Sequence, residues 1–593
     1  MNRSPMVFPA LGEFVRHLES RGELRRITAQ VDSRLEVTQI AVRALQEQKP
    51  ALLFENVKGC RFPLAVNVYA SQNRINMALG RDPEEIGLEL IGFAEQMMPP
   101  KLSAVWKSRS MIGKALRARQ ASVASAISQE VVSQLTLDDL PIQVCWPKDG
   151  GRFITQGEVV TYGPDDGKRN IGMYRMHVFG PRETGMHWQI QKGGGFHYHR
   201  AEQRRQDLEV AVALGTDPAL MLASIAALPE GMDEAVFAAF LRGSPTKFAK
   251  GTAVSISVPA AAEFVLEGVV PVDERRKEGP FGDHFGHYSH AALFPVFHLR
   301  TITHRKNPIY PATVVGIPPM EDKFLGDATQ LILGPLARLI HKEVKAVWAY
   351  YEAGFHNLLV VSVEERYHKE AMKAAFGLLG TGQLSLTKCL ILVSEHVDPQ
   401  NWQAVVREIK ENFDPHFDYV LLPKVPLDTL DFTSFTMELG SKMIVDATRK
   451  TRPPAEKKAA RIDEREIRRF DRRIIDAAVV DDTLLLVKVA GDGKRIIDKL
   501  VQRKELRHLK IIAAVSEDVD IRDRENYLWG VFTRFDCERD ILFTEQKLIG
   551  ISPVYKGVMG IDATWKKGYP EALVMDEKIV RSVDRRWNEF WND

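Results

Sequence analysis

The chain has 593 residues, enough for about three or four domains of ordinary size. Hydrophobic residues make up 45% of the chain and charged residues 27%, and the formal net charge is +2, which excludes the strongly basic surface of a typical nucleic-acid-binding protein. Four cysteines without CxxC spacing exclude a disulfide framework and a thiolate zinc site, and because no apolar run reaches membrane-spanning length we expect a cytoplasmic protein.

The first part of the chain alternates between helical and strand-like patterns. Apolar residues recur at helical spacing between Leu11 and Leu18, and Gly22 then ends the pattern. The runs ELRRITAQV and ALLFEN, which come later, are typical of strands. We therefore predict an N-terminal α/β domain over residues 1–115.

Short strand-like runs separated by glycine and proline dominate the middle of the chain. VVTYGP, TAVSISVP and FPVFHLRTITHR are examples, and their close spacing is typical of a β-barrel or a sandwich. We therefore predict a β-rich domain over residues 116–318.

The last part of the chain contains an internal repeat. Helical and strand-like patterns alternate again, and NLLVVSV near 358 and SKMIVDATRK at 441 are echoed by TLLLVKV at 483 and GVMGIDATWK at 557. We predict an α/β domain over residues 319–452. A charge-dense linker helix that begins with prolines and a second copy of the module would then occupy residues 453–593.

A segment rich in cations and metal-capable side chains covers residues 169–195 and is predicted to form a hairpin that turns at Gly180. Alternation in its first strand would place Arg175 and His177 on one face. The glycines 193–195 remove side chains where a ligand could approach the backbone. This composition suits a bulky anion such as a phosphorylated cofactor, and a solvated surface ribbon is the plainer alternative.

Two acids, Glu278 and Asp283, lie five residues apart in KEGPFGDHFGHYSH, across a turn rich in glycine and proline that would point both carboxyls into one space. Such a pair near a guanidinium suits proton donation at neutral pH if one acid stays ionised and the other has a raised pKa. An acidic turn in water is the alternative. His284, His287 and His290 suggest a metal only weakly, and satisfied or exposed histidines fit their spacing better.

Two further motifs offer groups for an anion or a metal. Glu234 lies in the first turn of a predicted helix, where its ordinary role would be to complement the helix dipole. In LGSKMIVDATRK, Gly440, Ser441 and Lys442 form a candidate anion cradle. The second copy has Val558 at the position of Lys442, so we expect that copy to be structural.

Taken in series, these motifs resemble the UbiD family of decarboxylases, which use prenylated FMN. The resemblance covers most of residues 10–450. It implies an α+β multidomain fold, in which the central domain is a split β-barrel that binds the flavin and the C-terminal α/β domain mediates oligomerisation. The matching motifs are PALLFENVKG, RNIGMYR, GMHW, VALGTDPA, LRGSPT, VPAAAEFVLEG, EGPFGDH and LGSKMIVDAT.

Carried over residue by residue, the resemblance implies that Asn170 and Glu234 ligate a divalent metal, usually manganese, that ties the protein to the cofactor phosphate. His187 matches a third ligand of some members, and amide and carboxylate oxygens suit such a hard cation. Ala223 and Ser224 match a stretch that binds K+ in some relatives. The implied cofactor contacts are Asn170, Met173, Tyr174, Arg175, Met186, His187, Trp188, Gln189, Lys192, Gly193 and Lys442.

The same resemblance implies a catalytic network in which Arg175 lies between Glu278 and Asp283. The flavin would act as the electron sink while carbon dioxide leaves, and one of the two acids would return a proton. The implied substrate is an aromatic acid of quinone biosynthesis. GMHW and the chain length favour a menaquinone precursor such as a dihydroxynaphthoate, and a 4-hydroxy-3-polyprenylbenzoate of ubiquinone biosynthesis is the alternative.

The resemblance also implies partners. A flavin prenyltransferase would supply the cofactor, copies of the same chain would form a dimer or hexamer, and a lipid-tailed substrate would bring peripheral contact with a membrane. We expect no nucleic-acid partner. A non-catalytic flavin-binding scaffold and a simple flavin reductase are alternatives from other classes, but neither needs an arginine between two acids.

Overall fold

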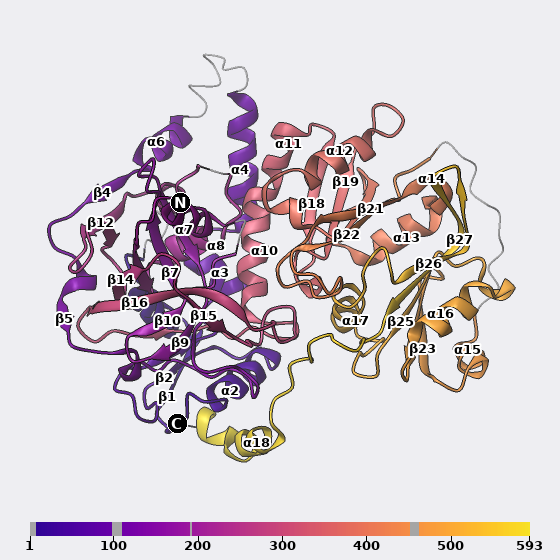
Figure 1. Ribbon diagram of the computed structural model, residues 1–593. Coiled ribbons are helices and arrows are strands. Elements are labelled where there is room, and N and C mark those ends of the chain that lie inside the picture. The colour runs from indigo at the N-terminus through magenta and orange to yellow at the C-terminus, as the bar shows by residue number, and fades with distance from the viewer. Residues whose placement is uncertain (1–7, 98–108, 190–191, 230, 451–461, 593) are drawn as a thin grey trace. The chain divides into compact units, whose positions relative to one another are not determined.

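The computed structural model describes residues 8–97, 109–189, 192–229, 231–450 and 462–592 (Figure 1). The chain forms two compact units. The first unit comprises Met1–Ile332 and Glu571–Asp593, and the second comprises Leu333–Pro570. The last residues of the chain therefore belong to the same unit as the first ones.

A small sheet with the strand order β1-β2-β3-β17 lies at the start of the first unit. α1 (Leu11–Ser20) buries the apolar residues that helical spacing selected, so this prediction is confirmed. Each such buried side chain contributes roughly 1.5–3 kcal/mol to folding. The other elements are β1 (Leu24–Ile27), α2 (Glu36–Gln46), β2 (Ala51–Phe54), β3 (Leu64–Val66), α3 (Gln72–Leu79), α4 (Pro83–Gln96) and β17 (Tyr310–Pro311).

The centre of the first unit is a ten-stranded sheet with the main order β6-β9-β10-β16-β14-β11-β7-β8, and all its pairs are antiparallel. In the part of the chain that is described, its end strands β6 and β8 do not pair, so the sheet is an open half-barrel and not a closed barrel. Its strands are β5 (Val131–Ser133), β6 (Phe153–Ile154), β7 (Glu158–Tyr162), β8 (Arg169–Met173), β9 (Met176–Gly180), β10 (Glu183–Gly185), β11 (Leu208–Leu214), β14 (Phe264–Val270), β15 (Arg275–Glu278) and β16 (Ala292–His304).

Helices and a small three-stranded sheet complete this central region. α7 follows the β9–β10 hairpin, and α8 and α9 follow β11. The small sheet has the order β13-β12-β4. The bounds are α6 (Arg109–Arg117), β4 (Gln120–Ser122), α7 (Gly193–Gln203), α8 (Pro218–Ile225), α9 (Glu234–Arg242), β12 (Thr246–Lys250), β13 (Ser257–Pro259) and α10 (Glu321–Leu333).

The predicted hairpin is partly wrong in its first strand. The hairpin itself is formed by β9 and β10, but β8 ends at Met173 and a two-residue bend, Tyr174 and Arg175, separates it from β9. The reason lies in the sheet: β8 and β9 belong to opposite ends of the strand order, so the bend carries the chain across the open seam of the half-barrel. One continuous alternating strand cannot make that crossing, and Arg175 therefore lies at the seam.

The second unit contains two sheets of five strands with the same topology, β18-β19-β20-β22-β21 and β23-β24-β25-β27-β26. Parallel and antiparallel pairs occur in the same sequence in both, so the predicted duplication is confirmed. The first sheet has β18 (Val344–Ala349), β19 (Leu358–Val363), β20 (Cys389–Ser394), β21 (Tyr419–Pro426) and β22 (Leu439–Asp446), with α12 (Glu370–Leu379) and α13 (Trp402–Asn412). The second has β23 (Ile474–Val480), β24 (Leu484–Val489), β25 (Ile511–Val515), β26 (Ile541–Ile549) and β27 (Ser552–Ala563), with α15 (Glu464–Phe470), α16 (Gly493–Val501) and α17 (Arg524–Phe532).

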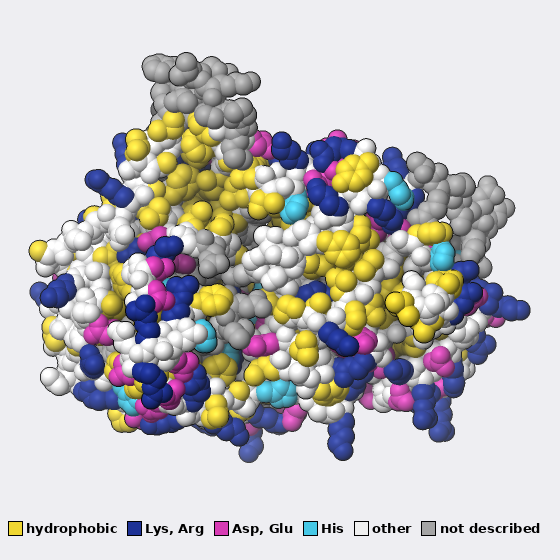
Figure 2. Space-filling view, turned by 45° about the horizontal axis from the view of Figure 1, so that its top comes forward, with side chains coloured by type: hydrophobic (Ala, Val, Ile, Leu, Met, Phe, Trp, Pro, Cys, Tyr) yellow, Lys and Arg dark blue, Asp and Glu magenta, His cyan; other side chains and the backbone are white. Residues whose placement is uncertain are grey.

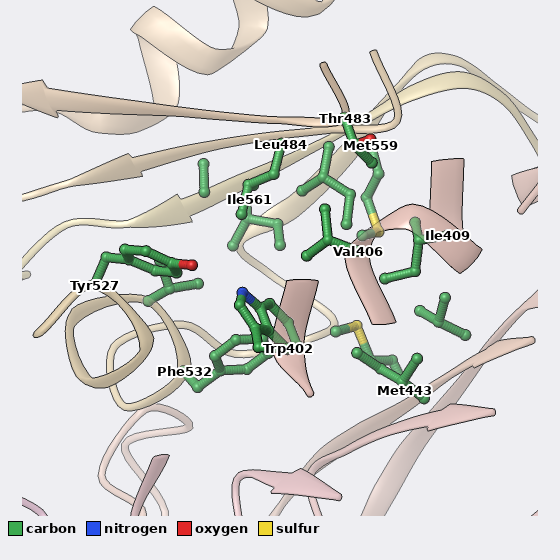
Figure 3. A pocket seen from close by; sticks show the side chains of 15 residues that line it. Trp402, Val406, Ile409, Met443, Thr483, Leu484, Tyr527, Phe532, Met559 and Ile561 are labelled. Carbon is green, nitrogen blue, oxygen red and sulfur yellow. The ribbon is translucent and has the colours of Figure 1, made fainter. Parts of the chain in front are cut away.

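An apolar pocket lies between the two modules of the second unit. Figure 3 shows Trp402, Val406 and Met443 from the first module facing Leu484 and Met559 from the second. The start of the predicted linker, residues 453–461, lies outside the described residues, and α15 is the linker helix that follows it. The two copies are thus held together by packed apolar side chains.

The surface charges and the apolarity of the helices agree with what the composition predicts. On the face shown in Figure 2, lysine and arginine side chains are interspersed with aspartate and glutamate. None of the helices in the described ranges is both long and apolar enough to cross a membrane.

Candidate active site

The structure brings Arg175, Glu278 and Asp283 together. The guanidinium donates from Nε to Glu278 Oε1 at 2.9 Å, from Nη2 to Glu278 Oε2 at 3.2 Å, and from Nη1 to Asp283 Oδ2. A third partner, Ser289, accepts a hydrogen bond from Nη2 at 3.1 Å. The side chain of Glu278 is fully buried and that of Arg175 is 8% exposed, so an acidic turn in water is excluded.

The local fold explains this convergence. Glu278 is the last residue of β15, and Asp283 follows in a loop, residues 279–288, that we call the acid loop. Gly279 adopts a φ of 88°, which a residue with a side chain rarely tolerates, and so permits the sharp turn out of β15. The turn folds the acid loop back, and both carboxylates reach the guanidinium at the seam.

Both acids are held in the ionised form. Burial alone would raise the pKa of Glu278, but Arg175 and the neighbouring His187 outweigh it and lower the pKa to about 2. Burial likewise opposes ionisation of Asp283, and Arg175 together with His284 holds its pKa well below the ordinary range. The expectation that one of the two acids has a raised pKa is therefore wrong, because a single guanidinium contacts both.

His187 lies beside this network. Its Nδ1 is 3.2 Å from Glu278 Oε2, and its ring centroid is 4.2 Å from that of Phe294. Its buried Nε2 has no hydrogen-bond partner among the residues that the structure describes. Burial and the positive charge of Arg175 lower the pKa of His187, which favours the neutral imidazole. The structure thus places His187 with the acids, with one ring nitrogen left for a ligand.

A second cluster forms a cradle around the start of α7. An added Cβ at Gly193 would lie 2.1 Å from Asn170 Oδ1, and one at Gly194 would lie 2.7 Å from Trp188 Nε1, so only glycine fits. Within the described part of the chain, the buried atoms Asn170 Nδ2 and Trp188 Nε1 have no hydrogen-bond partner, and the Gly194 N–H donates to the Tyr174 hydroxyl at 3.2 Å. The first N–H groups of a helix bind anions, so this cradle fits a phosphate-bearing cofactor.

Glu234 contacts β8, the strand that carries Asn170. It is the first residue of α9, as predicted, and its Oε2 accepts a hydrogen bond from the N–H of Ile171 at 3.0 Å. Burial raises the pKa of Glu234 to about 7. An ion pair of 2.7 Å between Arg169 and Asp233 fixes α9 to β8. Asn170 and Glu234 therefore offer an amide and a carboxylate oxygen to a hard cation, although within the described ranges no three His, Cys, Asp or Glu side chains cluster as a metal site.

Most of the remaining predicted contacts lie in the first unit. Met186 is fully buried, Ser224 donates from Oγ to the Met221 carbonyl at 2.7 Å, and Lys192 is the residue before α7. Met173, Gln189 and Ala223 complete this group; Met173 ends β8, Gln189 lies between Trp188 and α7, and Ala223 is buried in α8.

Lys442 lies in the second unit, on β22. Its ammonium donates to the carbonyls of Ser385 and Thr387, each at 2.8 Å, and burial lowers its pKa to about 8. The neighbouring Ser441 donates to Asp536 at 3.0 Å. In the second copy, Val558 is fully buried in the core of the module, in line with a structural role.

The three histidines of the acid-loop motif are satisfied or exposed, as expected. His284 Nδ1 lies 2.8 Å from Asp283 Oδ1, and His287 Nδ1 lies 2.8 Å from the Phe285 carbonyl, while His290 is exposed.

The structure shows a further residue at the site, Asp149, which the sequence analysis did not identify. Asp149 accepts hydrogen bonds from the backbone N–H groups of Trp146 and Gly282, both at 2.8 Å, and so holds the acid loop directly before Asp283. Burial raises the pKa of Asp149 to about 6. In the sequence it is one acid of a WPKDGG turn, and nothing there links it to a residue 133 positions later.

Comparison with known proteins identifies the family. Models described as the N-terminal, Rift-related and C-terminal domains of 3-octaprenyl-4-hydroxybenzoate carboxy-lyase match residues 15–93, residues 117–318, and residues 323–447 with 477–563. A protein of Chlamydia pneumoniae, named as one component of a 4-hydroxybenzoate decarboxylase, is 35% identical over 582 residues, which cover 96% of this chain and 97% of that one.

Two solved structures are similar as well. The closed form of vanillic acid decarboxylase from Sedimentibacter hydroxybenzoicus has a TM-score of 0.67 and 27% identity, over 77% of this chain and 96% of that one. The UbiD-class enzyme HmfF from Pelotomaculum thermopropionicum, in complex with prFMN, has a TM-score of 0.62 and 25% identity, over 75% of this chain and 95% of that one. The matched domains span most of the sequence and the Chlamydia relative aligns along nearly its whole length, so the chain belongs to the UbiD family and is a carboxy-lyase.

Proposed function

We propose that this protein removes the carboxylate of an aromatic acid with the help of prenylated FMN. The observation that carries the proposal is the buried network in which one guanidinium contacts both Glu278 and Asp283. Buried charges are costly even when paired, and a scaffold or a flavin reductase has no need for this trio. The neighbours support the same chemistry, since one is a vanillic acid decarboxylase and another is in complex with prFMN.

The glycine cradle is the proposed phosphate site in the half-barrel, which we propose as the flavin-binding domain over residues 116–318. The N–H groups at the start of α7 would bind the phosphate, and Asn170 and Glu234 would hold a divalent ion such as Mn2+ against it. His187, whose Nε2 has no partner in the described ranges, is the candidate for a further ligand. When bound, prenylated FMN supplies the electron sink for the bond that breaks.

The chain's own residues would manage the substrate charge and the proton. Arg175 would bind the substrate carboxylate, the ordinary partner of a guanidinium. When Arg175 also binds the substrate carboxylate, it would lower the pKa of Asp283 less. Burial would then raise that pKa and favour the protonated acid. Asp283 would thereby hold the proton that replaces carbon dioxide on the substrate carbon. Glu278, which makes two hydrogen bonds to Arg175, would keep the guanidinium in place.

For the substrate we propose a menaquinone precursor such as a dihydroxynaphthoate, on the strength of the GMHW segment and the length added by the second module. A 4-hydroxy-3-polyprenylbenzoate of ubiquinone biosynthesis is the second candidate, favoured by the family description and the name of the Chlamydia relative. A flavin prenyltransferase would supply the cofactor, and the chain would work as a homo-oligomer in the cytoplasm.

Anaerobic co-expression with a flavin prenyltransferase tests this proposal. The purified protein should carry the flavin absorbance and release carbon dioxide from naphthoate or hydroxybenzoate acids. Asp283→Asn should keep the absorbance and lose the release. Asp273→Asn is the matched control, because Asp273 is an exposed acid of the first unit that pairs with Arg205 at the surface. Protein that binds the flavin but releases no carbon dioxide from any of these acids would contradict the proposal.

A further inference from the structure

A short segment near the end of the chain pairs with the acid loop. Ala572 forms an antiparallel bridge with His287, flanked by two backbone hydrogen bonds. The Tyr288 N–H donates to the Glu571 carbonyl at 3.1 Å, and the Leu573 N–H donates to the Gly286 carbonyl at 2.9 Å. We call residues 571–573 the brace. It pairs with the loop that carries Asp283 through this isolated bridge.

The brace also packs against the loop through a side chain. Leu573 is 3% exposed, and an added Cβ at Gly282 would lie 2.9 Å from Leu573 Cδ2 and 2.3 Å from Trp146 Cδ1. Gly282 is thus enclosed between these two side chains, while its N–H is held by Asp149 at 2.8 Å. Side chains and a hydrogen bond therefore hold Gly282, the residue directly before Asp283. Asp283 is held as well, because its N–H donates to the His287 carbonyl within the loop at 3.1 Å.

A helix anchors the brace to the first unit. α18 (Glu577–Trp591) follows it and buries Val583, Trp587 and Phe590. Arg43 of α2 lies over the Trp587 ring at 4.0 Å, and Arg586 pairs with Glu36 of α2 at 2.6 Å. In Figure 1, α18 lies beside α2. The acid loop thus pairs with the brace along its length, and α18 holds the chain that follows the brace.

We propose that the brace is a positioning element of the active site: residues 571–573 hold the acid loop so that the Asp283 carboxylate stays on Arg175, in reach of the substrate. This inference rests on the proposed function for its catalytic part. The brace and the acid loop both belong to the first unit. None of the three brace residues needs to touch the substrate.

The test uses the full-length protein and two readouts. In the first, deuterium exchange of peptides covering the acid loop is measured without cofactor. Leu573→Ala should speed exchange there at least tenfold, because it removes the side chain that encloses Gly282. In the second, the loaded enzyme carrying Leu573→Ala should lose about tenfold to hundredfold in kcat with KM changed less than about twofold, since a small displacement of a catalytic group slows chemistry more than binding. Leu573→Met, which keeps the volume, should restore both.

Two controls separate positioning from general loss of stability. Val574→Ala changes the next residue, which is 71% exposed, and should leave both readouts unchanged. Leu500→Ala removes an equally buried leucine from the core of the second module and should leave acid-loop exchange unchanged.

The outcomes are distinct. Unchanged acid-loop exchange in Leu573→Ala, or faster exchange with unchanged kcat, overturns the inference. If the wild-type protein releases no carbon dioxide from any acid but Leu573→Ala still loosens the acid loop, the proposed function fails while the holding role of the brace is supported.

Discussion

Replacing Arg175 by glutamine should reverse the pH dependence of stability in the first unit. In the wild-type protein, burial raises the pKa of Glu278, but Arg175 and, with it, His187 outweigh burial and lower that pKa from an ordinary 4.5 to about 2. That difference, 4.5 minus about 2, corresponds to about 3 kcal/mol of folding free energy at neutral pH, at about 1.36 kcal/mol for each pKa unit. This stabilisation is complete above pH 4.5 and is lost as the pH falls toward 2.

Without the guanidinium, His187 and His284 still lower the pKa of the two carboxylates, but burial, the largest single influence on each, should outweigh them and raise both pKa values, so the sign changes. Arg175→Gln should lose about 3–5 kcal/mol at pH 7, the cost of leaving buried charge unpaired. It should regain stability as the pH falls from 7 to 5, where protonation removes that charge. Adding Glu278→Gln should recover part of the loss at pH 7, because it removes one of the two unpaired carboxylates.

Native-state hydrogen exchange in urea, read on peptides from β16, measures this effect in the first unit alone. That choice is needed because a chain with two compact units does not have to unfold in one step. An Arg175→Gln protein that is as stable as the wild type at pH 7, or that loses further stability between pH 7 and 5, would refute the reasoning.

Three further predictions follow from the site and the fold. Asp283→Asn should lower carbon dioxide release at least a hundredfold with the flavin still bound, because an amide cannot donate a carboxylic proton; normal turnover, measured as carbon dioxide released, would contradict this. Gly193→Ala should lower flavin retention at least tenfold, measured by absorbance after desalting, because its Cβ would lie 2.1 Å from Asn170 Oδ1; full retention would show that the cradle does not bind the cofactor. Trp402→Ala should destabilise the second unit by about 3–5 kcal/mol, because its buried ring packs between the two modules. Hydrogen exchange of β24 peptides measures this loss, and unchanged exchange in β24 would mean that the modules fold independently.

The elements of the second unit were predictable because its strands are buried on both faces. NLLVVSV and TLLLVKV are apolar in both copies of the module. They form β19 and β24, which occupy the same position in two equivalent sheets. In contrast, the strand through Arg175 was predicted as continuous, because alternation in sequence does not reveal that β8 and β9 pair at opposite ends of one sheet. Strand order is a long-range property that local periodicity does not carry.

Residue types determined the chemistry of the candidate site. The residue types indicated that Glu278 and Asp283 could share one space near a guanidinium, and the resemblance to the UbiD family supplied Arg175 as that guanidinium and the class of enzyme. The tertiary structure decided how the charges are shared. Both acids are ionised because one buried guanidinium contacts them at once, and Asp149 and Leu573 reach the acid loop from distant positions in the chain. Electrostatic energies depend on distance and burial, and only the folded chain sets those two quantities.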